Sequence, residues 1–288
     1  MQHEPEINTR IYLLPNLMTA GNLICGFLAV LRIFEGSLQR TANGGEGNDW
    51  ILTYESSLYF ILGAFIFDIL DGRLARLGGH DSPFGREFDS LADVISFGVA
   101  PALLVFHIVL YQLQDKIGWA VASIYLVCGA LRLARFNVYA TIPHHQPSKE
   151  FTGFPIPAAA GLVSSITLLM LHFYEKDRDL EQGWGKFLLA GLLVFLSFMM
   201  FSKFKYPSFK AFSLRTEHSL PKFILVVVLL ILILVFYWWM LAVVFVTYLF
   251  YGFLRPFLSR AMRREIEEDE ADELDRSGSG PQKEEKPF

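Results

Sequence analysis

The sequence is poor in charge and in cysteine. Of its 288 residues only 19% are Asp, Glu, Lys or Arg and just two are cysteines, whereas 53% are hydrophobic. A soluble globular domain has about 25% charged residues, so this composition excludes an ordinary soluble domain and favours a membrane protein. Cys25 and Cys128 both fall in apolar stretches, which predicts small packing residues rather than a disulfide or a ligand pair.

The start of the sequence lacks the pattern of a signal peptide, and its end lacks a long apolar run. The start, MQHEPEINTR, has neither the basic residues nor the small-residue cleavage site of a signal peptide, so we expect the first apolar stretch to be retained. The end, 256–288, lacks a long apolar run and carries a block of acids followed by a Gly/Ser/Pro-rich segment. This composition predicts a disordered acidic tail, because it offers too little apolar surface to fold.

Long apolar runs dominate the rest of the chain. A membrane-spanning helix needs about 20 mostly apolar residues. This criterion predicts eight helices, at 13–34, 56–76, 89–112, 117–138, 154–173, 186–202, 220–236 and 238–255. The expected fold class is therefore an all-α integral membrane protein. We expect 13–202 to form a membrane core and 220–255 a C-terminal helix pair, with 1–12 and the loop 203–219 in the cytoplasm.

The basic residues are distributed unevenly over the connecting segments. With the N-terminus in the cytoplasm, 19 of the 25 Lys and Arg residues fall on inner segments, as the positive-inside rule requires. Seven helices would instead put the basic residues after the last helix outside, so eight helices and two cytoplasmic termini are favoured. The stretch 35–49 is then expected to be a solvated outer loop. The six outer basic residues are Arg32, Arg40, Lys116, Lys176, Arg178 and Lys186.

The densest charge lies between two apolar stretches, in DILDGRLARLGGHDSPFGREFDSLAD (68–93). Asp68 and Asp71 are three residues apart and Asp89 and Asp93 are four apart, so each pair projects from one face of a helix. A loop of about ten residues makes these helices antiparallel neighbours. We therefore expect the four carboxylates to converge just below the cytoplasmic membrane surface.

Four converging carboxylates repel one another unless a cation lies among them. Mg²⁺, Mn²⁺ and Ca²⁺ take oxygen ligands, and two-metal sites recur in phosphoryl chemistry. The pattern therefore favours a divalent metal site. The alternative is that these acids pair only with Arg73, Arg76 and Arg86, or mark a solvated helix end. Asp81 and Glu87 fall off the shared face and are interpreted as surface charges.

Small residues beside the acids leave space for a ligand. Gly72 and Ala75 expose the backbone between them. Arg76 supplies a cation suited to a phosphate, and Gly85 lies one turn before Asp89, where it could clear the opposite wall.

These residues resemble the signature of the CDP-alcohol phosphatidyltransferase family. It reads D-x-x-D-G-x-x-A-R, eight residues, then G-x-x-x-D-x-x-x-D in 68–93, and no position departs from the family pattern. The resemblance implies that an alcohol attacks the phosphate that carries the diacylglycerol in CDP-diacylglycerol, and that CMP leaves. It also implies divalent metal, with two ions of Mg²⁺ or Mn²⁺, or Ca²⁺ as an alternative. It further implies a homodimer whose catalytic membrane core is 13–202.

The resemblance also implies a role for individual residues. Asp68, Asp71 and Asp89 correspond to metal ligands, and Asp93 to both a ligand and the general base that takes the proton of the alcohol. The positions that correspond to contacts with CDP-diacylglycerol are Gly72, Arg76 and Ser82, joined by Asn16, Leu17, Met18 and Thr19 in the segment PNLMT.

The alcohol is not defined by this signature, which family members for serine, inositol phosphate, glycerol phosphate and choline share. Three further stretches, PNLMTAGNLICGF (15–27), GALRLARFNV (129–138) and FTGFPIPAAA (151–160), resemble the phosphatidylserine synthase branch. The expected eight helices also suit that branch. The resemblance therefore implies L-serine, while glycerol 3-phosphate and inositol phosphate remain open.

Two arginines near the end of the fourth predicted helix are candidates for binding the alcohol. Arg132 and Arg135 lie three apart, so both can face one pocket, and Asn137 follows. A guanidinium group suits the carboxylate of an amino acid. The alternative is that both arginines are anchors that reach the lipid headgroups. A phosphorylated alcohol would use the same arginines, so they do not identify the substrate.

Other patterns carry less weight. Adjacent His144 and His145 point in different directions, which disfavours a metal site there. Pro155 and Pro157 suit the start of a helix or the wall of a headgroup pocket. A cation-coupled transporter would also carry intramembrane carboxylates, but these acids cluster at one face and no inverted repeat is visible. The expected partners are CDP-diacylglycerol, L-serine and membrane lipids, without nucleic acid.

Overall fold

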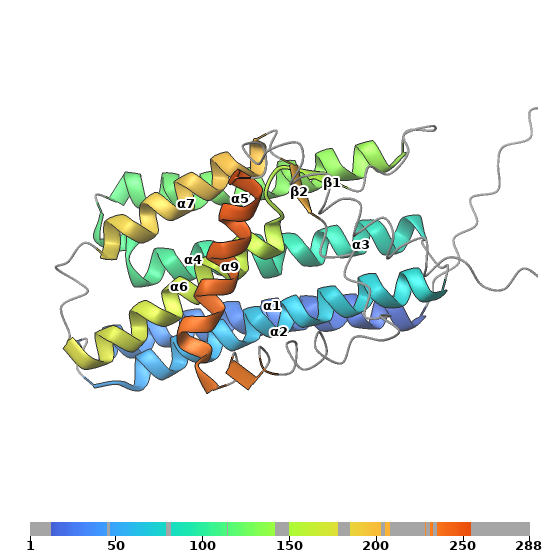
Figure 1. Ribbon diagram of the computed structural model, residues 1–288. Coiled ribbons are helices and arrows are strands. Elements are labelled where there is room, and N and C mark those ends of the chain that lie inside the picture. The colour runs from blue at the N-terminus through green and yellow to red at the C-terminus, as the bar shows by residue number, and fades with distance from the viewer. Residues whose placement is uncertain are drawn as a thin grey trace, which may run out of the picture.

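The computed structural model describes residues 13–44, 47–78, 82–113, 115–141, 150–177, 185–202, 205–207 and 235–254, together with 228, 231 and 232. In this part of the chain, six long helical segments run side by side along one axis and a further helix crosses them (Figure 1). The long segments are α1 (Leu13–Ala42), α2 (Asp49–Gly78), α3 (Pro83–Asp93) continued by α4 (Ala100–Ile108), α5 (Asp115–Thr141), α6 (Ile156–Asp177) and α7 (Gly185–Phe201).

Five helical segments are long and apolar enough to cross a membrane. They are Leu13–Ala42, Asp49–Leu74, Pro83–Ile108, Lys116–Val138 and Ile156–Phe173. Large apolar side chains such as Phe198 and Leu38, both 71% exposed, lie on the outside of the bundle, where a bilayer would cover them. The chain is thus a helical protein whose described part is consistent with an integral membrane protein.

The third segment changes its winding directly after Asp93. α3 starts at Pro83, and the Oγ of Ser82 accepts a hydrogen bond of 3.0 Å from the Gly85 amide, as an N-cap does. A π-helix, η1 (Val94–Val99), then joins α3 to α4, and the 3₁₀ turn η2 (Leu110–Gln112) follows. π-helical turns are rare and recur at functional sites. The hydroxyl of Tyr125 donates a hydrogen bond of 3.1 Å to the Phe97 carbonyl, which connects α5 to η1.

A short antiparallel ribbon forms beside the ends of α6 and α7. β1 (Glu150–Thr152) pairs with β2 (Lys205–Pro207), so the segment before α6 is joined to the segment after α7. Gly153 follows β1 with φ of +84°, and a Cβ there would collide with the Met200 carbonyl. Glycine is needed at this position both for the left-handed backbone and for the close approach.

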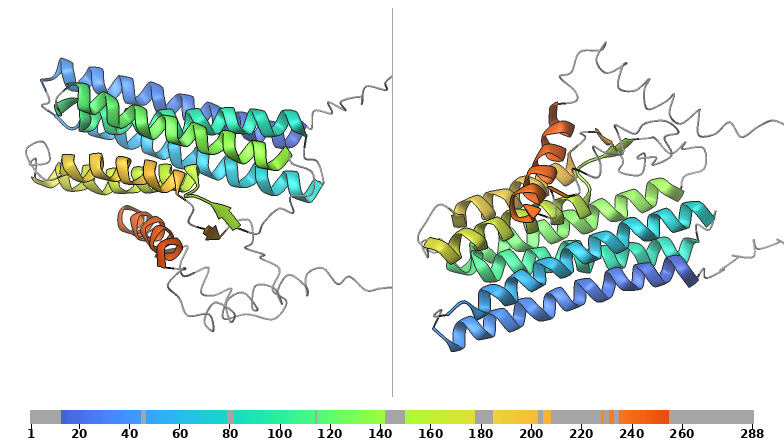
Figure 2. Two further views of the ribbon diagram at one scale, coloured as in Figure 1. Left: turned by 90° about the horizontal axis from the view of Figure 1, so that it is seen from above. Right: turned by 60° about the horizontal axis from the view of Figure 1, so that its bottom comes forward.

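The last described helix, α9 (Tyr237–Leu254), runs across the bundle at a steep angle to the other helices (Figure 2). It packs on α6, where the Phe245 ring fills the space beside Gly161. The same ring meets Phe65 of α2 edge-on, with centroids 5.7 Å apart. α9 therefore covers a face formed by α2 and α6.

The helix positions agree with the sequence-based expectation except at several ends. The prediction of an outer loop at 35–49 was wrong for 35–42, because α1 continues to Ala42. Polar partners stabilise this extension. Arg32 forms a salt bridge of 2.7 Å with Glu35, and the Thr53 hydroxyl donates a hydrogen bond of 2.8 Å to the Gln39 side chain. Hydropathy detects apolar length and not such polar contacts, one of which lies within α1 and the other between α2 and α1.

The connection between the aspartate-bearing helices is also shorter than expected. α2 ends at Gly78 and α3 begins at Pro83 rather than at 89, because the Ser82 cap and Pro83 start a helix that is too polar for the hydropathy criterion. α2 likewise begins at Asp49 rather than at 56. Most of the expected helix 220–236, and the segments 1–12 and 256–288, lie outside the described residues.

Candidate active site

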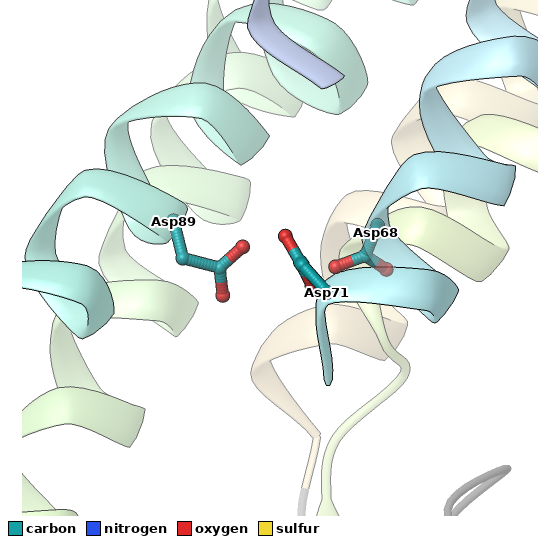
Figure 3. A group of neighbouring side chains, drawn as sticks. All are labelled: Asp68, Asp71 and Asp89. Atoms are coloured by element: carbon teal, nitrogen blue, oxygen red, sulfur yellow. The ribbon is translucent and has the colours of Figure 1, made fainter. Parts of the chain in front are cut away.

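Three of the four aspartates of the signature come together between α2 and α3. Asp68 and Asp71 project from α2 toward Asp89 on α3 (Figure 3). One carboxylate oxygen from each residue lies within 4.8 Å of the other two. Asp71 is buried, with 6% of its surface exposed, and the other two are half-buried. The antiparallel pairing expected from the sequence is therefore what gathers these carboxylates.

This group fits a hard divalent cation. At 4.8 Å and an effective dielectric constant of about 20, two unit charges repel by about 3 kcal/mol, and three carboxylates carry that repulsion pairwise. A cation among them would remove it, and carboxylate oxygens are the ligands that Mg²⁺, Mn²⁺ and Ca²⁺ prefer. A metal could thus be held by Asp68, Asp71 and Asp89.

Asp93 lies one helical turn deeper than Asp89 and outside the group of three. It is 5% exposed and interacts electrostatically with Asp68 and Asp89. Its Oδ1 accepts a hydrogen bond of 3.1 Å from the Nδ2 of Asn22 on α1. Asp93 is therefore the inner acid of the site, and its role as base and ligand stays a prediction.

α1 lines the site with a polar stripe. The hydroxyl of Thr19 lies 3.0 Å from Asp71 Oδ2, to which it donates. Asn16 lies against Gly85 of α3, where a Cβ would come within 3.2 Å of its Oδ1, and its Nδ2 has no acceptor among the described residues. Among the other residues expected to contact the nucleotide, Leu17 points outward and Met18 is half-buried.

Asn22 was missed by the sequence interpretation. It is the third member of a stripe at three-residue spacing, after Asn16 and Thr19, on an otherwise apolar helix. Polar side chains repeated on one face of a membrane helix indicate a partner inside the bundle. That spacing could have identified Asn22 without a structure.

The remaining expected contacts to CDP-diacylglycerol have different surroundings. A Cβ added at Gly72 would meet no atom of the described residues within 4 Å, which leaves space there for a ligand. Ser82 is buried, and its Oγ serves as the α3 cap. Arg76 lies in the last turns of α2, and its side chain is outside the described residues.

The three residues expected to bind the alcohol do not share one environment. Arg132 is 8% exposed, interacts electrostatically with Asp93 and Asp68, and has no acceptor for its Nε among the described residues. Arg135 instead lies over the Phe201 ring, 5.5 Å from its centroid. Arg132 thus interacts with the aspartates, and Arg135 packs on an aromatic ring.

Asn137, on α5, contacts α3 through residues other than the aspartates. Its Nδ2 donates a hydrogen bond of 2.9 Å to Ser90 Oγ and a longer one of 3.4 Å to Glu87 Oε2. These contacts join α5 to α3 outside the carboxylate group. His144 and His145 lie outside the described residues.

α9 adds a residue to which the sequence assigned no role. Tyr248 interacts electrostatically with Arg132, and its ring lies 5.7 Å from that of Phe154, centroid to centroid. Phe154 is fully buried and directly follows Gly153. The C-terminal helix therefore reaches the surroundings of Arg132.

Carboxylates gathered at one end of an apolar helix bundle, beside a buried arginine, define a membrane enzyme suited to metal-assisted phosphoryl transfer. The chain belongs to the CDP-alcohol phosphatidyltransferase family, whose sequence model matches residues 12–207. This stretch includes every residue of the site on α1, α2, α3 and α5.

Several curated proteins are similar to this chain over most of their length. A protein of Helicobacter pylori strain J99 named CDP-diacylglycerol–serine O-phosphatidyltransferase is 37% identical over 245 residues, which are 85% of this chain and 91% of that protein. A Bacillus subtilis protein of the same name is 34% identical over 68% of this chain and 91% of its own length. An archaetidylserine synthase of Methanothermobacter thermautotrophicus is 34% identical over 69% of this chain and 71% of its own length.

Proposed function

We propose that this protein transfers the phosphatidyl group of CDP-diacylglycerol to the hydroxyl of L-serine, giving phosphatidylserine and CMP. A bond forms between the serine oxygen and the phosphorus that carries the diacylglycerol, and the bond from that phosphorus to the oxygen of CMP breaks. The serine proton passes to a base. The family match and the relatives named for this reaction support this function.

The choice of serine depends on Arg132. Its guanidinium group is buried beside Asp93, and its Nε lacks an acceptor in the described part of the chain. A carboxylate in this position would satisfy the guanidinium group with a charge-assisted hydrogen bond. Serine brings such a carboxylate, and its hydroxyl would then lie near Asp93, which we assign as the general base.

Asp68, Asp71 and Asp89 would hold the divalent metal, with Asp93 completing the ligand set on the inner side. Mg²⁺ or Mn²⁺ is proposed, with two ions, because carboxylates favour hard cations. A bound metal supplies charge that stabilises the developing charge on the phosphate and on the leaving CMP.

The nucleotide would lie between α1 and the start of α3. The open backbone at Gly72 permits close approach, and the buried Nδ2 of Asn16 offers a hydrogen bond donor. Arg76 would pair with the phosphates. Thr19 would act here by holding Asp71, to which its hydroxyl donates.

We further propose that the site faces the cytoplasm, with eight spans, two cytoplasmic termini and a homodimeric assembly. The same end of the bundle carries Arg73, Arg86, Arg132 and Arg135, as expected for a cytoplasmic face. The lipid substrate would enter sideways from the bilayer.

Glycerol 3-phosphate and inositol phosphate are the alternative alcohols, since their phosphates would also suit Arg132. A cation-coupled transporter gains no support from the family match or from the relatives.

The test is an alcohol panel. The purified protein in detergent is given CDP-diacylglycerol with serine, glycerol 3-phosphate, inositol phosphate or choline, and CMP release and lipid product are measured. We expect phosphatidylserine as the main product. Preferential reaction with another alcohol would reject serine but retain the chemistry, and failure to release CMP with any alcohol would reject the transferase.

A further inference from the structure

The hydrogen bond between Asn22 and Asp93 joins helices that are far apart in the sequence. Asn22 lies in the first half of α1, and its Nδ2 donates a hydrogen bond of 3.1 Å to Asp93 Oδ1 at the end of α3. Asn22 is 0% exposed. A buried amide on an apolar membrane helix is costly unless it has a specific partner, and here that partner is the inner acid of the site.

Within the described part of the chain, the side chain of Asn22 forms its hydrogen bond with Asp93. Its Oδ1 is buried and has no donor among the described residues. A residue placed for helix packing alone would satisfy both ends of its amide or would be apolar. Because the Nδ2 is directed at a carboxylate, it fixes one oxygen of Asp93 and leaves Oδ2 as the oxygen able to accept a proton.

The backbone around this hydrogen bond is held in register. The hydroxyl of Ser96, in η1, donates a hydrogen bond of 3.0 Å to the backbone carbonyl of Asn22. Gly26, one turn further along α1, lies so close to Ser96 that any Cβ there would collide with it. The π-helical turn after Asp93 is therefore packed directly against α1, and this contact sets the distance between Asn22 and Asp93.

On the basis of the function proposed above, we propose that Asn22 is a positioning residue for the transfer step. Its amide holds Asp93 so that the second carboxylate oxygen faces the incoming hydroxyl. Asn22 acts through Asp93 and makes no contact with the nucleotide. Its loss should therefore slow turnover and leave the binding of both substrates nearly unchanged.

Two variants test this role. Asn22→Leu removes the donor with little change in size, and Asn22→Asp keeps the shape but replaces the donor with an acceptor. In each we expect kcat to fall by about 10- to 100-fold, as for the loss of a hydrogen bond to a charged group. The KM for CDP-diacylglycerol and for serine should stay within about 3-fold of wild type, measured by steady-state titration of the full-length protein in detergent.

The matched control is Thr167→Val. Thr167 is also 0% exposed, and its hydroxyl donates only to the Val163 carbonyl of its own helix, at 2.7 Å. This variant should keep the wild-type kcat. Thermal unfolding of each variant measures how far a loss of folding contributes. If Asn22→Leu does not fold, Asn22→Asp decides.

Two outcomes would overturn the role of Asn22. One is a folded Asn22→Asp or Asn22→Leu protein with wild-type kcat. The other is a variant in which kcat falls only in step with thermal stability while both KM values rise, because that pattern indicates packing alone. If the wild type does not use serine, the same comparison is made with the alcohol that releases CMP, so failure of the serine assignment is separable from failure of the positioning role.

Discussion

At the scale of single residues, the site divides into three carboxylates that face one another and an inner acid that Asn22 holds. Asp68, Asp71 and Asp89 face one another, whereas Asp93 is held by Asn22 and lies in electrostatic contact with the buried Arg132. Asp68, Asp71 and Asp89 are thus assigned to metal binding alone, whereas Asp93 is also assigned to proton transfer. Substitutions of the two kinds should have different kinetic effects.

Asp93→Asn should abolish turnover and preserve binding of CDP-diacylglycerol. The new amide can present its oxygen to the Nδ2 of Asn22, so the hydrogen bond seen in the structure is retained. The amide cannot take the proton of the alcohol, and loss of a general base costs about 10²- to 10⁴-fold in rate. Single-turnover CMP release and equilibrium binding of CDP-diacylglycerol measure the two effects. Turnover within a few-fold of wild type would reject Asp93 as the base.

Arg132→Leu should raise the KM for serine by about 10- to 100-fold, since a hydrogen bond to a charged group contributes about 1.5–3 kcal/mol. The KM for CDP-diacylglycerol should change much less. Arg135→Leu is the control, because Arg135 packs on Phe201, and it should affect serine less than Arg132→Leu does. Titrations of both substrates give the comparison. Unchanged serine dependence in Arg132→Leu would make Arg132 a structural residue.

At the scale of elements, the sequence predicted the order of the described helices but not their ends. Apolar length located α1, α2, α5, α6 and α7 well. It failed where helices continue as polar segments, as in the last turns of α1 and the first turns of α3. Those turns are stabilised by an ion pair within α1, by a hydrogen bond between α1 and α2, and by the Ser82 cap. The π-helical turn and the crossing of α9 depend on tertiary packing, which no local pattern encodes.

The ribbon between β1 and β2 offers a test at this scale. Gly153→Ala should destabilise the protein by about 1–3 kcal/mol, because alanine is strained at φ of +84° and its Cβ would collide with Met200. Thermal unfolding in detergent measures the loss. Gly191→Ala in α7 is the matched control: its Cβ would meet nothing within 4 Å, and alanine favours a helix by up to about 1 kcal/mol. Equal stability of the two variants would contradict the tight docking of the ribbon.

At the scale of the whole molecule, the site joins segments distant in the chain. Carboxylates come from α2 and α3, their hydrogen bond donors from α1, an arginine from α5 and its neighbour Tyr248 from α9. The motif spacing predicted the carboxylates because they lie on two helices joined by a short turn. It could not predict Asn22 as a partner of Asp93 or the approach of α9, since these contacts depend on how the whole bundle packs.

Divalent metal should therefore stabilise the bundle as well as support the reaction. A cation bound by Asp68, Asp71 and Asp89 joins α2 to α3, and a ligand at 100 times its dissociation constant adds about 2.7 kcal/mol to the stability of the folded state. We expect a chelator to stop CMP release and to lower the unfolding temperature, and Mg²⁺ or Mn²⁺ to restore both. In Asp89→Ala, which loses the α3 ligand, added metal should no longer raise the unfolding temperature. Full activity after chelation, or an equal response of Asp89→Ala and wild type to metal, would show that these carboxylates do not hold the cation.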